Sequence, residues 1–339
     1  MGLQEFWFVL IAVLFTGYFV LEGFDFGVGM LLRVLGRTDT RRRVLLNTIG
    51  PVWDGNEVWL ITAGGAMFAA FPEWYATLFS GFYLPLLLIL VALILRIVAI
   101  EWRGKIDDDR WRSRADLGIM IGSWVPAVLW GVAFANIVRG VAIDENKKVT
   151  SSLFDLLNPY ALLGGITIAL VFALHGAVFI ALKTADDVHV DAADLAKKLA
   201  IPTVPIAGGF VLWTQLAYGK SWTWILVALA AIAVVAVVFL TRVEREGWAF
   251  VFTTVAIVAT SVLLFASLFP NVMPSTTDAA FSLTIDNASS SPYTLKVMSW
   301  AAVILTPIVL IYQGWTYWVF RKRISTKHIP PSIGLPVGK

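Results

Sequence analysis

The sequence contains no cysteine, few histidines and little charge. Of its 339 residues, 14% are charged and three are histidines. The absence of cysteine excludes disulfides, thiolate metal sites and cysteine nucleophiles. In a soluble domain about a quarter of the residues are charged, so this chain does not belong to that class.

Motifs that indicate particular chemistries are also missing. The chain has no phosphate-binding glycine loop, no dinucleotide fingerprint, no nucleophile elbow and no spacing typical of a metal site. It has no basic patch with interleaved aromatic residues, so we expect neither a bound metal nor nucleic-acid binding. By itself, the chain lacks the residues needed for redox catalysis.

Long apolar segments are what the sequence does contain. Hydrophobic residues make up 58% of it, and its mean hydropathy is +0.79. The first segment carries acidic residues and has no cleavage site, so we interpret it as a retained span and not as a signal peptide. With about 20 apolar residues per span, the sequence predicts an all-α, polytopic membrane protein with nine transmembrane helices. The predicted spans are residues 6–32, 51–71, 76–100, 117–139, 160–182, 200–218, 222–242, 248–268 and 297–320.

Basic residues alternate between the two sides of these predicted spans. One set of connections holds 20 Lys and Arg residues, and the other set holds 5. Because basic connections stay in the cytoplasm, the N-terminus is expected outside and the C-terminus inside. The basic connections are residues 33–50, 101–116, 183–199, 242–247 and the tail from Arg321.

This orientation gathers several charged residues at one depth, in the cytoplasmic halves of the first three spans. A charge near the bilayer centre costs at least about 2.5 kcal/mol, so it is rarely kept unless it faces a protein interior or a wet cavity. The group could be an inlet for cytoplasmic protons, because carboxylates along a wet path accept and release protons in turn. It could also be a polar lock among three helices, in which the arginine neutralises one acid. The residues are Glu22, Asp25, Asp54, Glu57, Arg96 and, at the boundary, Glu101.

His175 is the one histidine inside a predicted span. Haem ligation by two histidines would need a second histidine at membrane depth, and the sequence has none there. Ligation together with a methionine such as Met120 stays open as an alternative. We favour an interior histidine held by hydrogen bonds.

Without the help of a resemblance, the sequence leaves three classes of protein open. The chain could be a proton-conducting subunit of a larger enzyme, a secondary transporter acting alone, or a membrane subunit with a purely structural or assembly role. Transporters usually show internal repeats with broken helices near the midplane. Here the charged group lies in the first three spans, and no matching group follows later in the chain.

Several segments of the chain have distinctive sequences. The most distinctive are residues 22–30 (EGFDFGVGM) and 53–66 (WDGNEVWLITAGGA). The others are residues 79–83 (FSGFY), 122–126 (GSWVP), 158–159 (NP), 269–275 (FPNVMPS), 282–284 (SLT) and 289–291 (SSS). In this order, and over nearly the whole chain, these segments resemble the cytochrome bd quinol oxidase subunit II family.

The resemblance implies a fold and a partner. It implies one integral membrane domain over residues 1–339, built as two four-helix bundles plus one extra helix. The first bundle would occupy about residues 1–140, and the second bundle with the final helix about 155–325. Subunit II would pair with subunit I as a heterodimer in the bacterial plasma membrane, within the lipid and with or without small accessory subunits.

The resemblance also implies an activity. Enzymes of this family oxidise quinol and reduce oxygen to water, with two b-type haems and one d-type haem ligated in subunit I and none in subunit II. Some members hold a structural quinone in subunit II. Members are thought to supply part of a cytoplasmic proton path, assigned to the aspartate that Asp54 matches, and Glu57, Arg96 and Asp25 carry over as its polar lining.

Overall fold

The computed structural model describes residues 2–330 and 334–336 of the chain. Helices dominate this part, and the strands are only two or three residues long. The α-helices are α1 (Leu3–Leu35), α2 (Asp39–Ile49), α3 (Trp53–Ala70), α4 (Pro72–Gly81), α5 (Tyr83–Trp102), α6 (Asp109–Arg139), α7 (Pro159–Lys183), α8 (Asp186–Tyr218), α9 (Trp224–Arg242), α10 (Glu246–Leu268) and α11 (Pro292–Val319). The short elements are β1 (Ile106–Asp107), β2 (Asn271–Met273), β3 (Leu283–Thr284), β4 (Leu335–Pro336), and the 3-10 turns η1 (Asp155–Leu157), η2 (Ser221–Thr223), η3 (Ala279–Phe281) and η4 (Thr326–His328).

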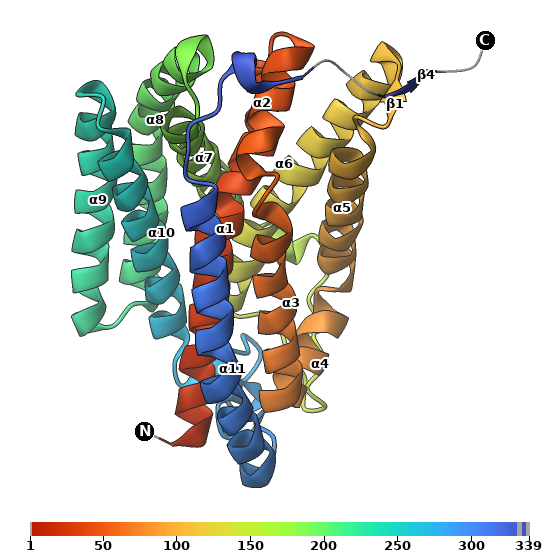
Figure 1. Cartoon of the computed structure of the whole chain (residues 1–339). Coiled ribbons are helices and arrows are strands. Elements are labelled where there is room, and N and C mark those ends of the chain that lie inside the picture. The colour runs from red at the N-terminus through yellow and green to blue at the C-terminus, as the bar shows by residue number, and fades with distance from the viewer. Residues whose placement is uncertain (1, 331–333, 337–339) are drawn as a thin grey trace.

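The long helices run roughly parallel to one another, with α1 near the middle (Figure 1). Helix α1 packs against α3 and α6 on one side and against α7 and α10 on the other. Helix α11 lies along α1 and α3. The start of α1 and strand β4 lie at opposite ends of the molecule (Figure 1). Strand β4 pairs in parallel with β1, and β2 pairs antiparallel with β3.

The core around α1 is built from aromatic rings and from close backbone contacts. The rings of Phe15 and Phe19 each lie 5.1 Å from the ring of Phe134 on α6. Farther along α1, Gly27 faces Gly176 of α7: a methyl group added at Gly27 would lie 2.2 Å from the carbonyl oxygen of Phe172. Small residues let helix backbones approach this closely, which fixes α1 against α7.

The all-α membrane fold predicted from the sequence is confirmed. Of the helices in the described residues, eight are long and apolar enough to cross a membrane, and they correspond to eight of the nine predicted spans. Helix α3, which covers the predicted span at 51–71, is not among the eight. Its first turns contain Asp54, Asn56 and Glu57, which lower its hydropathy. The number of nine crossings therefore stays a prediction.

Several predicted boundaries were wrong, each for a physical reason. The predicted span at 76–100 is divided at Phe82 between α4 and α5, because Pro85 has no N–H for the helical bond to Gly81. The predicted connection 33–50 contains α2, whose start is capped by Thr38.

Helix α8 also begins earlier than expected, at Asp186 and not at residue 200. Val188, Ala192, Ala196 and Ala200 are all buried along its first half. This four-residue spacing places them on one face of an amphipathic helix. A search for purely apolar windows does not register such a helix.

Candidate functional site

The ion pairs of Arg96 form the centre of a buried polar group between α1, α3 and α5. Arg96 is fully buried, and its Nη1 forms ion pairs with Oε1 of Glu22 and, at 2.8 Å, with Oε1 of Glu57. Its guanidinium lies 4.8 Å from the centre of the Phe26 ring. One cation on α5 thus joins acids from the other two helices, as the charge pattern predicted.

Asp25 joins the same group through an amide. Its Oδ2 accepts a hydrogen bond of 2.7 Å from Nδ2 of Asn56, and both side chains are fully buried. Oδ1 of Asn56 in turn accepts hydrogen bonds from Nε2 of Gln313 at 3.1 Å and from the hydroxyl of Tyr317 at 2.7 Å. The last helix, α11, therefore closes the group from a fourth side.

Four atoms of this polar group have no partner among the described residues. They are Glu22 Oε2, Asp25 Oδ1, and Nε and Nη2 of Arg96, all of them buried. A buried polar atom without a partner costs about 1–3 kcal/mol, so such atoms normally bind ordered water. The three acids also outnumber the single arginine, and bound protons would offset the excess negative charge. These features suit a hydrated site that binds and releases protons.

The structure does not bring Asp54 and Glu101 into the buried group. Asp54 is exposed, and its Oδ1 accepts a hydrogen bond from the N–H of Gly55. Glu101 is exposed at the end of α5, away from the ion pairs of Arg96. Spacing along a helix placed Asp54 near Glu57, but it could not show which face is covered.

A second ionic group lies nearby at the basic end of the molecule. Asp116 of α6 is fully buried and binds Nε of Arg103 at 2.6 Å and Nη1 of Arg42 at 2.9 Å. Arg103 also pairs with Asp39 at 2.7 Å. Burial lowers the pKa of Arg103, but its bonds to Asp116 and Asp39 outweigh that effect and raise it above its usual value.

His175 has a partner for each ring nitrogen. Its Nδ1 lies 2.6 Å from the hydroxyl of Thr253, and its Nε2 lies 3.2 Å from the carbonyl oxygen of Val20. The ring stacks on Phe250 at a centroid distance of 4.6 Å. No group of three or more potential metal ligands occurs among residues 2–330 and 334–336.

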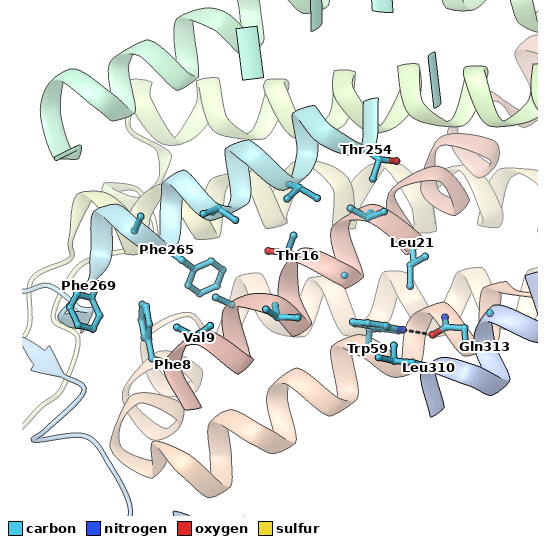
Figure 2. Close-up of a pocket in the computed structure, with 18 of the residues that line it drawn as sticks. Phe8, Val9, Thr16, Leu21, Trp59, Thr254, Phe265, Phe269, Leu310 and Gln313 are labelled. Carbon is cyan, nitrogen blue, oxygen red and sulfur yellow. Dashed lines mark hydrogen bonds between the residues drawn. The ribbon is translucent and has the colours of Figure 1, made fainter. Parts of the chain in front are cut away.

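A large apolar groove lies between α1, α10 and α11 (Figure 2). Its volume is about 1010 Å³. Phe8 and Phe269 lie near one end, and the hydrogen bond from Trp59 to Gln313, at 2.9 Å, lies near the other. The stretch of α1 from Phe8 to Leu21, both of which line the groove, is roughly 20 Å long at 1.5 Å per residue.

Sequence reasoning missed the neutral members of the site. Asn56, Trp59, Gln313 and Tyr317 link α3 to α11 through hydrogen bonds. A signal was present, since Asn56 stands between two acids and Gln313 lies inside an apolar span. The search for charged residues alone did not use that signal.

Together, these features define an α-helical membrane protein with a buried acidic group. The chain matches the family of cytochrome bd terminal oxidase subunit II over residues 3–320. The chain belongs to this family.

Named relatives agree with this assignment. Cytochrome bd ubiquinol oxidase subunit 2 of Bacillus subtilis is 44% identical, over 96% of this chain and 98% of that protein. Cytochrome bd-I ubiquinol oxidase subunit 2 of Escherichia coli K12 is 39% identical, over 96% of both chains. The fold resembles a chain in the structure of bd oxidase from Geobacillus thermodenitrificans, with a TM-score of 0.75 at 16% identity, covering 94% of this chain and 97% of that one.

Proposed function

We propose that this chain is one subunit of a quinol-oxidising, oxygen-reducing membrane enzyme. This subunit ligates no haem itself and carries protons from the cytoplasm into the membrane interior. The single observation behind the proposal is a graded series of acids. Asp54 is exposed, the Glu57 side chain is 14% exposed, and Glu22 and Asp25 are fully buried. Such a series leads from the surface to a buried polar interior, as a proton path requires.

Two haems b and one haem d would lie in subunit I, which is the expected partner. Both ring nitrogens of His175 already have partners here, which supports assigning haem ligation to the other chain. Bound haem there would supply electron transfer and oxygen activation. The exposed apolar side chains of α5, including Leu88, Leu90 and Val91, suit either lipid or that subunit.

The protein residues would move protons and not electrons. Asp54 would take up a proton at the surface and pass it to Glu57, three residues along α3. Water bound at the unpartnered atoms of Glu22 and Asp25 would continue the path inward. If the enzyme draws the protons it consumes from the cytoplasm and releases quinol protons outside, it builds a membrane potential without pumping.

The orientation remains that of the sequence prediction, with the N-terminus outside a bacterial plasma membrane and the basic end of the molecule in the cytoplasm. The apolar groove suits the isoprenoid tail of a quinone or an acyl chain of a lipid, because its lining is almost entirely apolar. Its polar pair, Trp59 and Gln313, is mutually hydrogen-bonded. Accessory subunits, if present, would occupy other faces.

The test uses the assembled oxidase in lipid vesicles. Asp54→Asn should slow quinol-driven oxygen consumption and the build-up of membrane potential, with the haem spectrum intact. The matched control is Glu73→Gln, an exposed acid at the start of α4. Wild-type turnover and potential in Asp54→Asn would remove the inlet role of Asp54.

A structural role is the second candidate, favoured by the ion pairs of Arg96 to Glu22 and Glu57. In that case Glu22→Gln would lower the stability of the complex but leave the turnover of the intact fraction unchanged. A transporter acting alone would instead purify without any haem protein.

A further inference from the structure

Within the buried polar group around Arg96, the amide of Asn56 is the side chain held by the most hydrogen bonds. It is fully buried and engaged at both ends. Its Oδ1 accepts two hydrogen bonds from α11, and its Nδ2 donates to Asp25 and, at 3.5 Å, to the carbonyl oxygen of Leu21. Three helices, α1, α3 and α11, therefore meet at one amide.

The two donors on α11 determine which way this amide points. If the amide turned over, its NH₂ group would face the donors of Gln313 and Tyr317, and its oxygen would face the Asp25 carboxylate. The amide would then lose its bonds to Gln313 and to Asp25 together, because the Gln313 nitrogen can only donate and a carboxylate can only accept. Each bond contributes stability inside a low-dielectric interior, so the observed orientation is strongly preferred.

Gln313 is itself held in place. Trp59, one turn beyond Asn56 on α3, donates from its indole Nε1 to Oε1 of Gln313 at 2.9 Å, as Figure 2 shows. With that oxygen occupied, the Gln313 amide presents its nitrogen to Asn56. Trp59 thus fixes the orientation of the Gln313 amide, and Gln313 in turn fixes the orientation of the Asn56 amide.

Polar contacts matter for α11 because it has little other contact with the bundle. Leu295 is the one residue of α11 that is buried. Near its C-terminal end the helix meets α3 through Gln313 and Tyr317, which are both half-buried, while Tyr312 beside them is exposed. These two polar residues therefore link the outermost helix to the acidic group.

We propose that Tyr317 and Gln313 are positioning residues that fix the Asn56 amide and so keep Oδ2 of Asp25 hydrogen-bonded and its Oδ1 free for a proton or water. The inference rests on the proposed proton path and adds a role for the last helix in it. Oδ2 of Asp25 accepts the Asn56 bond, and its Oδ1 has no partner among the described residues. The Asn56 donor stabilises the ionised carboxylate relative to the same site without that donor, and only an ionised carboxylate can accept a proton.

Other charged and titratable groups also face Asp25, and the test must hold them constant. They are Glu22 on α1, Glu57 on α3, Arg96 on α5 and Tyr317 on α11. Two buried polar side chains of α6 and α7 that lie against α1 are engaged elsewhere: Ser123 bonds to the carbonyl oxygen of Ile119, and His175 bonds to Val20 and Thr253.

Two variants disturb the arrangement in the purified oxidase. Asn56→Leu keeps about the same side-chain volume, adds no titratable group and removes the donor to Asp25. The double variant Tyr317→Phe with Gln313→Leu keeps the donor but removes what orients it. The control is Tyr312→Phe on the exposed face of the same helix.

The readouts are the pH profile of turnover, the quinol KM and the infrared band of the Asp25 carboxyl group, identified by its loss in Asp25→Asn. In both variants, the fall in turnover on the acidic side of the pH profile should occur at a pH about one unit higher than in the wild type. The infrared band should shift, and the quinol KM should stay unchanged. Tyr312→Phe should match the wild type. Complex assembly is checked by the haem absorbance of each preparation.

Two results would overturn the proposal in distinguishable ways. If Asp25→Asn slows turnover while Asn56→Leu and the double variant keep the wild-type profile and infrared band, the positioning role is wrong and the proton path stands. If Asp25→Asn itself matches the wild type, both the path through Asp25 and the positioning role are wrong. Should the double variant not assemble, the single variant Gln313→Leu takes its place, and a wild-type profile and infrared band in that variant would likewise overturn the positioning role.

Discussion

Arg96 on α5 and Glu57 on α3 are joined by an ion pair with 2.8 Å between Nη1 and Oε1. The same nitrogen of Arg96 also pairs with Glu22 on α1, so one guanidinium group connects three helices. Taking these charges out of water is costly, and their mutual attraction offsets that cost only while every partner is present. Arg96 is therefore the group's least replaceable member.

Arg96→Gln should destabilise the protein strongly. Removing one partner of a buried ion pair leaves uncompensated buried charge and costs about 3–5 kcal/mol. A lower thermal midpoint of the complex in detergent, followed by loss of haem absorbance, is the expected result. Arg114→Gln is the control, since Arg114 is exposed, and equal midpoints for the two variants would contradict the prediction.

Adding Glu22→Gln to Arg96→Gln should recover part of the lost stability. The double variant lowers the number of buried charges, so fewer are left without a partner. Thermal midpoints of the two single variants and the double variant give the coupling between the sites. Strictly additive losses would mean that the two residues do not interact.

The sequence predicted the charged members of the site because charge inside an apolar run is expensive and therefore conspicuous. Glu22, Asp25, Glu57 and Arg96 were identified in this way, and all four lie in or beside the buried group. Neutral amides and hydroxyls cost less to bury than charges, so Gln313 and Tyr317 give a weaker signal in an apolar helix than the acids and Arg96 do.

What the sequence could not supply is the direction in which each helix face points. A helix that is apolar on all sides has no periodicity to reveal its buried face. Asp54 and Glu57 share a helix and lie three residues apart, yet one is exposed and the other partly buried. That difference depends on where α5 and α11 pack, which the residues of α3 do not encode.

Gly27→Ala should destabilise the junction of α1 and α7. The added methyl group would lie 2.2 Å from the carbonyl oxygen of Phe172 and 2.6 Å from Cα of Gly176, so the backbones must move apart. Overpacking of this kind costs about 1–3 kcal/mol. Gly209→Ala is the control because nothing lies within 4 Å of its added methyl group, and the measurement is the thermal midpoint of each variant.

His175→Ala should leave the haem spectrum of the oxidase unchanged while lowering its stability. The histidine ring fills space against Phe250 and bonds to Thr253 and Val20, so its loss creates a cavity and leaves the Val20 carbonyl oxygen without that partner. The difference spectrum of reduced and oxidised enzyme is the measurement. Disappearance of a haem band from an intact complex would assign a ligand role to His175.

Asp116→Asn should lower the stability of the protein at its basic end, where Asp116 forms ion pairs with Arg42 and Arg103. The buried Asp116 carboxylate pairs with Arg103 and Arg42, and an amide would leave Arg42 without that counter-charge and Arg103 with Asp39 alone. The expected cost is about 3–5 kcal/mol, as for other broken buried pairs, and it should change little with salt because buried pairs are poorly screened. Asp109→Asn is the control, since that side chain is 94% exposed in its pair with Arg112 and should contribute at most about 1 kcal/mol. Thermal midpoints and the rate of proteolysis in the connection between α5 and α6, each measured at low and high salt, separate the two variants, and equal effects would show that burial of Asp116 contributes nothing.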